Sequence, residues 1–283
     1  MKILTFDIED WWVYDYNGIG NKTDWLPRLD GYLNQILDLL DERNIKATFF
    51  ILGEVAKNYS IVVRRIAERG HHIGCHSFSH KFLKNITPDE FLEDTLKALD
   101  AIENCIGYKV NAYRAPAFSI TEHNKWALSI LAENGIEYDC SIFPVMRSFG
   151  GFPTYKERVP SIIEIDGYRI KEFPISPANV LGRDVVYSGG GYFRLFPYWK
   201  IKSLVDSNEY VMTYFHVKDF DKKQKRIYTS LEGESTFIRY IKRYYGLSRS
   251  FANFNRLIVD FDFMNLLQAD RRINWSNQPL VKL

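Results

Sequence analysis

Cysteine is scarce in this sequence of 283 residues, and its start lacks the features of a secretory signal. The three cysteines, Cys75, Cys105 and Cys140, match no zinc-site spacing and form no even disulfide framework. Reduced thiols are typical of a cytoplasm, and the apolar run after Met1 is too short for a signal peptide. We therefore expect a cytoplasmic protein, peripheral at most to the inner face of a membrane.

Net charge and long apolar runs are also scarce. The 37 basic and 35 acidic residues leave a formal charge of +2, which is too balanced to indicate nucleic acid as a partner. No run approaches the roughly 18 apolar residues of a membrane span, so we expect no transmembrane segment. Aromatic residues make up 16% of the chain, which suits a large core and also offers rings for stacking on sugars. The oligomeric state has no signature in the sequence.

Short apolar runs alternate with helical patterns in the N-terminal half of the chain. Between these runs, apolar residues recur at helical spacing, and Thr87-Pro88-Asp89-Glu90 carries the signature of a helix start. Repeated strand–helix units predict an α/β fold with a parallel sheet, either open or closed into a barrel. The strands are expected near residues 2–6, 47–52, 72–75, 111–114 and 136–139.

This alternation breaks after the fifth strand. Asp166-Gly167 separates two apolar runs and predicts a β-hairpin, and the glycine-rich residues 188–192 predict a flexible loop. We expect one domain, with residues 1–220 as its main body and residues 221–283 as a C-terminal helical elaboration packed on it. Later segments are expected to form a helix, a strand and two further helices, near 196–207, 210–215, 233–246 and 250–267.

Polar side chains that can bind a metal or move a proton follow five of the expected strands. Parallel α/β folds place active sites at the carboxyl ends of strands, so these residues are candidates for one site. The spacing of His76 and His80 suits one divalent ion, and a carboxylate from the first strand would complete a His-His-carboxylate set. In chain order the candidates are Asp7, Glu9, Asp10, His76, His80, Arg114, Asp139 and His216.

The remaining candidates have complementary chemistry. A second carboxylate that does not bind metal could accept the proton of an attacking water. Arg114 could pair with that base and fix its direction. His216, which follows the last strand, could protonate a leaving amine. Together these groups favour metal-assisted hydrolysis.

The candidates lie in motifs that resemble those of the polysaccharide deacetylases, carbohydrate esterase family 4, which have the nodulation-type chitooligosaccharide deacetylase fold. The resemblance spans about residues 1–220, and residues 76–80 match its most specific motif, His-Ser/Thr-x-x-His. The other four motifs are matched by Thr5-Phe6-Asp7, by Arg114-Ala115-Pro116, around Asp139 and by Phe215-His216.

Further segments resemble one subfamily, which is associated with bacterial exopolysaccharides and has an extra C-terminal helical segment. These segments are the Asp-x-Glu-Asp-Trp start and residues 138–144 and 172–174. The resemblance implies a distorted (β/α) barrel of about seven parallel strands with an inserted hairpin and C-terminal helices. It also implies a hydrolase that removes N-acetyl groups from acetamido sugars of a surface polysaccharide or its precursor.

The resemblance implies a role for each matching residue. Asp7 is the general base, and Arg114 is its tether. His216 is the general acid, and Asp139 orients it. A backbone N–H near Ala117 helps to hold the oxyanion.

The implied cofactor is a divalent metal ion, with zinc as the expected species, bound by His76 and His80. The family's usual third ligand is a second Asp, but this chain has Ile8 there, and an apolar side chain cannot bind a hard cation. Residues i and i+2 of a strand share a face, so Glu9 is the expected substitute. Asp10 is the fallback.

The expected partner is an N-acetylated oligo- or polysaccharide, whose sugar, linkage and N- or O-acyl group the sequence does not specify. Trp11, Trp12, Phe118 and Tyr192 are candidates for stacking on sugar rings.

Two alternative functions are compatible with the same fold. One is a metal-independent hydrolase of cyclic amides, similar to an allantoinase, and the other is a glycan-binding homologue without catalysis.

Overall fold

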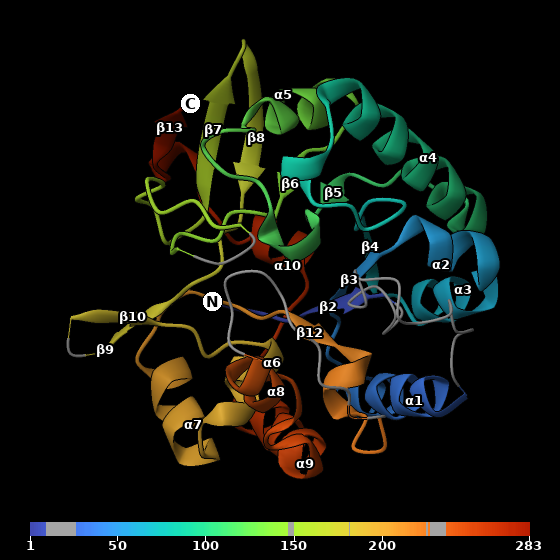
Figure 1. Cartoon of the computed structure of the whole chain (residues 1–283), viewed down its shortest axis with the longest axis vertical. Coiled ribbons are helices and arrows are strands. Elements are labelled where there is room, and N and C mark those ends of the chain that lie inside the picture. The colour runs from blue at the N-terminus through green and yellow to red at the C-terminus, as the bar shows by residue number, and fades with distance from the viewer. Residues whose placement is uncertain (10–26, 147–149, 181, 225, 227–235) are drawn as a thin grey trace.

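The computed structural model describes residues 1–9, 27–146, 150–180, 182–224, 226 and 236–283, and it is built around one central sheet (Figure 1). Over these residues the sheet contains β2 (Thr5–Ile8), β3 (Thr48–Ile51), β4 (His72–Cys75), β5 (Ala112–Tyr113), β6 (Tyr138–Asp139), β7 (Ser161–Ile165), β8 (Tyr168–Glu172), β12 (Phe215–His216) and β13 (Leu280–Lys282). Their order is β12-β2-β3-β4-β5-β6-β8-β7-β13. All neighbours from β12 to β8 are parallel, which confirms the α/β fold and its parallel run.

The first helices connect the parallel strands and lie along the right-hand and upper side in Figure 1. They are α1 (Pro27–Glu42), α2 (Gly53–Asn58), α3 (Ser60–Glu68), α4 (Pro88–Ile106) and α5 (Trp126–Glu133). Thr87 caps α4 as predicted, because its hydroxyl accepts from Glu90 N while the Glu90 carboxylate accepts from Thr87 N at 2.8 Å.

Later helices gather below the sheet in the same view, except for α10 and the short turns. They are α6 (Gly190–Leu195), α7 (Tyr198–Asp206), α8 (Thr236–Tyr244), α9 (Leu247–Asp260) and α10 (Leu266–Asp270). Single-turn 3₁₀ segments are η2 (Leu83–Asn85), η3 (Pro116–Phe118), η4 (Val217–Phe220) and η5 (Trp275–Asn277). The predicted helices near 233–246 and 250–267 correspond to α8 and α9.

The first and last predicted strands of the parallel run are each broken in two. β1 (Lys2–Ile3) pairs with β11 (Val211–Met212), whereas β2 pairs with β12. At the break, Thr5 N donates to the Thr213 hydroxyl at 2.9 Å instead of to a strand carbonyl. The side chain of Thr213 therefore replaces one backbone partner where both strands are interrupted.

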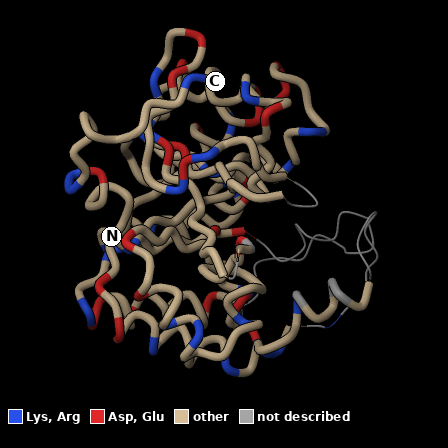
Figure 2. Tube along the Cα trace, turned by 90° about the vertical axis from the view of Figure 1, so that its left-hand side faces the viewer, with Lys and Arg blue, Asp and Glu red and all other residues tan. Residues whose placement is uncertain are grey.

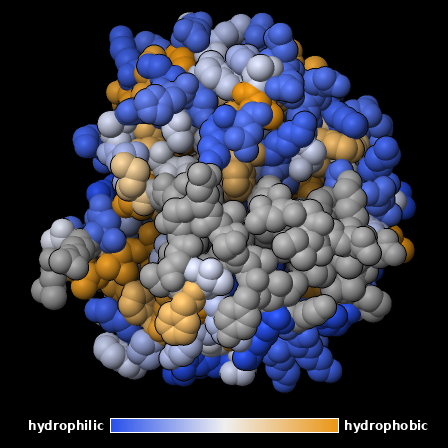
Figure 3. Space-filling view, in the orientation of Figure 1, coloured by the Kyte–Doolittle hydropathy of each residue, from blue (hydrophilic) through white to orange (hydrophobic). Residues whose placement is uncertain are grey.

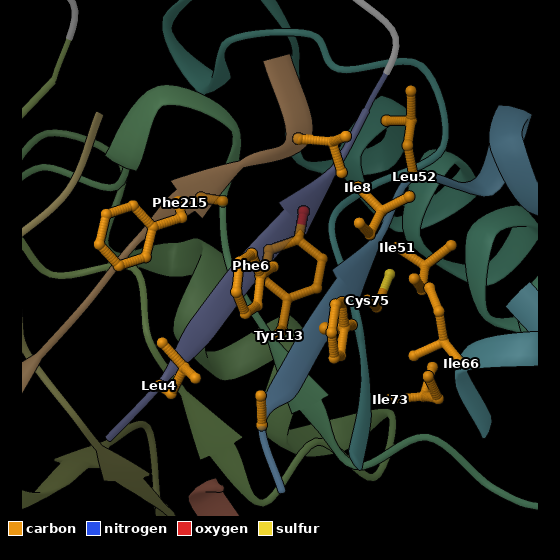
Figure 4. Close-up of a cluster of buried hydrophobic side chains, with 14 of the residues drawn as sticks. Leu4, Phe6, Ile8, Ile51, Leu52, Ile66, Ile73, Cys75, Tyr113 and Phe215 are labelled. Carbon is orange, nitrogen blue, oxygen red and sulfur yellow. The ribbon is translucent and has the colours of Figure 1, made fainter. Parts of the chain in front are cut away.

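Apolar side chains of the parallel strands and of the helices form a buried core cluster (Figure 4). Phe6 of β2 stacks on Phe49 of β3, with ring centroids 4.9 Å apart. Phe6 and Phe215 also contact Phe254 of α9, so the C-terminal segment shares this core. The predicted apolar stripe of α1 is buried, with Leu29, Leu33, Ile36, Leu37 and Leu40 in the cluster.

The predicted hairpin forms between β7 and β8. Its turn has left-handed backbone at Asp166 (φ 48°) and Gly167 (φ 82°), as a two-residue hairpin turn requires. β8 also pairs with β6, so the hairpin is part of the main sheet. β13 pairs with β7, which adds a strand to the C-terminal segment that we expected to be helical. The division of the domain at residue 220 stays a prediction.

The prediction of a flexible loop over residues 188–192 is wrong. α6 begins at Gly190, and Gly189 packs against the strand region before β12. A Cβ at Gly189 would lie 2.1 Å from Tyr214 O, so glycine serves close backbone approach here rather than mobility.

Charges of both signs are dispersed over the described surface. Lys and Arg alternate with Asp and Glu along the trace in Figure 2, in keeping with the small net charge. The face seen in Figure 3 is mixed, with hydrophilic areas above and an apolar area at the lower left. Among the described helices, none is both long and apolar enough to cross a membrane.

Candidate active site

The carboxyl ends of neighbouring parallel strands bring most of the predicted site residues to one edge of the sheet. β12 and β2 are paired so that His216 is level with Asp7. His216 Nε2 lies 3.7 Å from Asp7 Oδ2 and 3.3 Å from Glu9 Oε1. The residues that meet here are Asp7 and Glu9 from β2 and its end, His76 and His80 after β4, Arg114 after β5 and His216 of β12.

Glu9, His76 and His80 form a buried cluster in which one ligand atom of each residue lies within 4.8 Å of the others. Glu9 Oε2 lies 2.7 Å from His80 Nε2 and 3.6 Å from His76 Nε2. The alternation of side chains along β2 turns Glu9 to the same face as Asp7, while Ile8 enters the apolar core. Asp10, the fallback ligand, lies outside the described residues.

The donor atoms of this cluster fit a divalent cation. His76 Nδ1 lies 2.7 Å from Arg114 O, and since a carbonyl only accepts, Nδ1 carries a hydrogen and Nε2 is the ring nitrogen that faces the cluster. Burial lowers the pKa of His80 despite the nearby Glu9, which favours the neutral imidazole that metals bind. Glu9 Oε2 is buried and accepts no hydrogen bond from the described residues.

Glu9 is ionised as a ligand must be. Burial disfavours its carboxylate, but Lys218 and the neighbouring histidines outweigh that cost and hold the pKa of Glu9 well below its ordinary value. Lys218 Nζ donates to Glu9 Oε1 at 2.6 Å. One carboxylate oxygen therefore has a fixed partner, and the other faces the two imidazoles.

The two histidines are presented by a loop and not by a helical turn. Ser77 and His80 have left-handed backbone, with φ of 66° and 57°, a conformation that costs energy outside glycine and is common at functional sites. The carboxylate of Asp94, on α4, holds the loop by accepting from Phe78 N at 2.7 Å and from Ser79 N at 3.2 Å. It also accepts from the Ser79 hydroxyl.

Asp7 and Arg114 form a buried ion pair, with Arg114 Nη1 2.8 Å from Asp7 Oδ1. The same Nη1 donates to the Thr5 hydroxyl at 2.8 Å, and Nε donates to Cys140 O at 3.3 Å. The guanidinium also lies over the ring of Phe50, 4.2 Å from its centroid. These contacts hold Nη1 and Nε of Arg114 and leave Asp7 Oδ2 directed toward His216.

His216 is oriented by Asp219, and the prediction that Asp139 does so is wrong. Asp219 Oδ2 lies 3.0 Å from His216 Nδ1 and accepts from His216 N at 2.9 Å. The short η4 turn after β12 makes this possible, because it returns the third residue to the histidine. Burial disfavours the imidazolium, but Glu9, Asp219 and Asp7 outweigh it and raise the pKa of His216 to about 9.

Asp139 belongs to a different buried group. Its carboxylate accepts from the Ser141 hydroxyl at 2.5 Å and from Ser141 N at 3.2 Å. Glu172, at the end of β8, is its acidic neighbour, and burial together with the adjacent carboxyl raises the pKa of Glu172 well above its ordinary value. Asp139 therefore contacts Ser141 and Glu172, and not His216.

The remaining predicted residues differ in their placement. Trp11 and Trp12 lie outside the described residues. Ala117 lies in η3 with left-handed backbone (φ 53°) close to Arg114 in sequence, and its part in holding an oxyanion stays a prediction. Phe118 is wrong as a stacking surface, because it is 4% exposed and packs against Phe143 and Tyr214. Tyr192 is half-buried against the second core cluster and stays a prediction.

Sequence reasoning missed three side chains that shape the site. They are Lys218 beside Glu9, Asp219 beside His216, and Asp94 beneath the histidine loop. The spacing His216-x-x-Asp219 is a weak signal for a side-chain cap. The other two contacts join elements far apart in the chain, and no local pattern specifies them.

The arrangement places the chain among the nodulation-type (β/α) barrels. Comparison with known families agrees with this class. Residues 3–138, just under half of the chain, match the family model described as "Polysaccharide deacetylase". Residues 140–270 match a second model, described as a domain of unknown function, DUF3473.

Curated relatives match the N-terminal part of the chain. A peptidoglycan-N-acetylglucosamine deacetylase of Bacillus cereus is 35% identical over 122 residues, which are 41% of this chain and 44% of the relative. The peptidoglycan-N-acetylmuramic acid deacetylase PdaA of Bacillus subtilis is 31% identical over 110 residues, 36% of this chain and 42% of the relative. The chain thus spans less than half the length of these relatives.

A solved structure from Mycobacterium smegmatis, assigned as a polysaccharide deacetylase, shares the fold over nearly the whole chain. Its TM-score is 0.61 at 18% identity, with 99% of this chain and 92% of that chain covered. The superposition therefore extends beyond the part that the polysaccharide deacetylase family model matches.

Proposed function

We propose that this protein is a metal-dependent hydrolase that removes acetyl groups from N-acetylated amino sugars of a surface polysaccharide or its precursor. One observation carries the proposal. The candidate metal ligands, an ionised carboxylate and a carboxylate-bound histidine converge within a few ångströms at one edge of the sheet. Metal-assisted amide hydrolysis uses a Lewis acid, a base and an acid in this kind of proximity.

Glu9, His76 and His80 would hold the cation, and their nitrogen and oxygen donors suit zinc. A divalent cation bound there supplies Lewis acidity to the acetyl carbonyl and to the attacking water. The other groups of the site move the protons.

Asp7 acts as the general base. Its Oδ1 is held by Arg114 Nη1, and its Oδ2 accepts the proton of the water as the water oxygen bonds to the acetyl carbon. Arg114 does not give up a proton in this role, because a guanidinium stays charged. It fixes the direction of the carboxylate and offsets its burial.

His216 acts as the general acid. When the bond between the acetyl carbon and the sugar nitrogen breaks, His216 Nε2 donates its proton to that nitrogen. Asp219 holds Nδ1 on the opposite side of the ring and stabilises the imidazolium before the transfer. The products are acetate and a free amino sugar, so one water is consumed for each acetyl group released.

The names of the relatives specify N-acetylated sugars of peptidoglycan, which supports an N-acetylated sugar as the class of substrate. For this chain we favour an exopolysaccharide or its precursor because of the subfamily segments in its sequence. We keep the cytoplasm as the predicted location, which the free thiols of Cys75, Cys105 and Cys140 support. Cell fractionation would test this location.

The experiment is a screen of the zinc-loaded protein against N-acetylated oligosaccharides, with acetate and free amine both measured. We expect the two products in equal amounts. Turnover of a cyclic amide by the metal-free protein would support the allantoinase-like alternative. Saturable glycan binding with neither product would support the non-catalytic alternative.

A further inference from the structure

We propose that Arg194 is a positioning residue for the general acid, and that the C-terminal helices serve the reaction by holding Arg194 in place. The inference rests on the proposed function of His216. It assigns a task to a segment that lies beyond the polysaccharide deacetylase match at 3–138 and within the DUF3473 match at 140–270.

A chain of charged contacts runs from Arg194 to the site. Arg194 Nη1 donates to Asp219 Oδ1. The other oxygen of Asp219 faces His216 Nδ1 at 3.0 Å. Asp219 thus uses one oxygen for the arginine and one for the histidine, which fixes the plane of its carboxylate. The side chains of Arg194 and Asp219 are 4% and 7% exposed.

Arg194 also maintains the charge of Asp219. Burial alone would favour the neutral carboxyl, but the guanidinium and the imidazole outweigh it and keep the pKa of Asp219 below its ordinary value. An ionised carboxylate only accepts hydrogen bonds, so it fixes the ring of His216 with Nδ1–H toward Asp219 and Nε2 toward the site.

The turn between α8 and α9 holds Arg194 on both its backbone and its side chain. Arg194 Nη2 donates to Arg243 O at 2.9 Å, and Arg249 Nη2 donates to Arg194 O at 3.4 Å. Gly246 lies between these two residues with φ 74°, and a Cβ there would lie 2.5 Å from Arg194 O. The turn therefore encloses Arg194, and glycine is required for the close approach.

The start of α6 anchors Arg194 from the other direction. Gly190 N donates to Tyr214 O at 3.1 Å, and Tyr214 directly precedes β12, which carries His216. The helix that presents Arg194 and the strand that presents His216 are thus joined by backbone contact. A displacement of the turn between α8 and α9 would therefore be transmitted through α6 and Tyr214 to His216, the proposed general acid.

The test compares Arg194→Met, Arg194→Lys and the native protein, all loaded with zinc. In Arg194→Met we expect kcat to fall about 10- to 100-fold, the range for residues that orient a functional group. KM and zinc affinity should stay within about twofold, because the contact of Arg194 with the site runs through Asp219 and His216. Arg194→Lys should recover part of kcat, since it restores the charge.

A pair of glycine variants separates positioning from general loss of stability. Gly246→Ala and Gly107→Ala both force alanine into left-handed backbone, at φ 74° and 80°. Only at Gly246 does the new Cβ meet another group, whereas Gly107 has nothing within 4 Å. We expect a loss of kcat in Gly246→Ala and none in Gly107→Ala, with each variant assayed at a temperature where circular dichroism shows it to be fully folded. Equal kcat in the two variants would overturn the proposal.

A spectroscopic readout keeps this test independent of the proposed function. A proton NMR resonance of the His216 Nδ1–H, identified by its loss in His216→Gln, should lie far downfield because of the bond to Asp219. If the native protein releases no acetate from any glycan, this resonance is the readout that tests whether Arg194 positions His216. Its loss or exchange broadening in Arg194→Met supports the proposal, and an unchanged resonance contradicts it.

Discussion

The carboxylates of Asp7 and Glu9 stand two positions apart on one strand and meet different partners. Arg114 holds the first, while the second faces His76 and His80. A carboxylate bound to an arginine remains available to accept a proton, whereas one facing two imidazoles can complete a cation site. The division of roles at the residue scale follows from these partners, and it gives two predictions.

Glu9→Gln should weaken zinc binding at least about 10-fold, because it removes the single negative charge among the ligands. The measurement is competition for zinc with a chromophoric chelator. Glu42→Gln, an exposed position at the end of α1, is the control and should bind zinc as the native protein does. Native zinc affinity in Glu9→Gln would remove Glu9 from the metal site.

Asp7→Asn should bind zinc nearly as the native protein does, yet kcat should fall about 100- to 10,000-fold, the range for a positioned base. Steady-state acetate release and the same zinc competition give both quantities. If zinc affinity falls and kcat survives, the roles of Asp7 and Glu9 are exchanged.

At the scale of elements, the loop after β4 depends on α4. Asp94 accepts from two backbone N–H groups and one hydroxyl of the segment between the histidines. Such bonds to an ionised acceptor are worth more than neutral ones, and they offset the left-handed backbone at Ser77 and His80. The packing of α4 on the sheet therefore determines where the two imidazoles lie.

Asp94→Asn should lower the free energy of unfolding by about 1.5–3 kcal/mol, the range for hydrogen bonds to a charged group. Its amide keeps one acceptor oxygen and brings an N–H₂ toward groups that are themselves donors. Urea unfolding measures the stability. Zinc titration measures the zinc affinity, which shows whether the loop still places His76 and His80 correctly. Asp100→Asn, exposed on the same helix, should change neither. A normal zinc affinity in Asp94→Asn would show that the loop is held by other contacts.

The elements were predictable where local patterns govern them. Short-range chemistry specifies the capping box at Thr87, the hairpin turn at Asp166-Gly167 and the series of strands in the N-terminal half. Glu9 could be predicted for the same reason, since strand alternation alone puts it beside Asp7. The partner of His216 could not, because it depends on the η4 turn. The break between β1 and β2 could not be predicted either, because it depends on Thr213, which is distant in the sequence.

At the scale of the whole molecule, two buried histidines away from the site make stability depend on pH. Burial lowers the pKa of His71 and of His72 to about 4. His71 Nδ1 accepts from Ala47 N at 3.2 Å, which requires the neutral ring. The unfolded chain, with histidine pKa near 6.5, binds more protons than the folded protein between these values.

Stability should therefore fall as pH is lowered from about 6.5 to about 4. Urea unfolding across this range measures it. In His72→Gln the fall attributable to this group disappears, so the slope against pH should be shallower. His123→Gln is the control, because that side chain is 87% exposed and should leave the slope unchanged. If the slope in His72→Gln equals that of the native protein, the folded protein must bind a proton at His72 as readily as the unfolded chain does.

The proposed hydrolysis depends most directly on the candidate metal site of Glu9, His76 and His80. The measurement is acetate release from an N-acetylated oligosaccharide after exhaustive chelation, followed by titration with zinc. We predict a loss of at least about 100-fold, since the Lewis acid is removed, and recovery that saturates at one zinc per chain. Full turnover of the chelated protein would contradict the account.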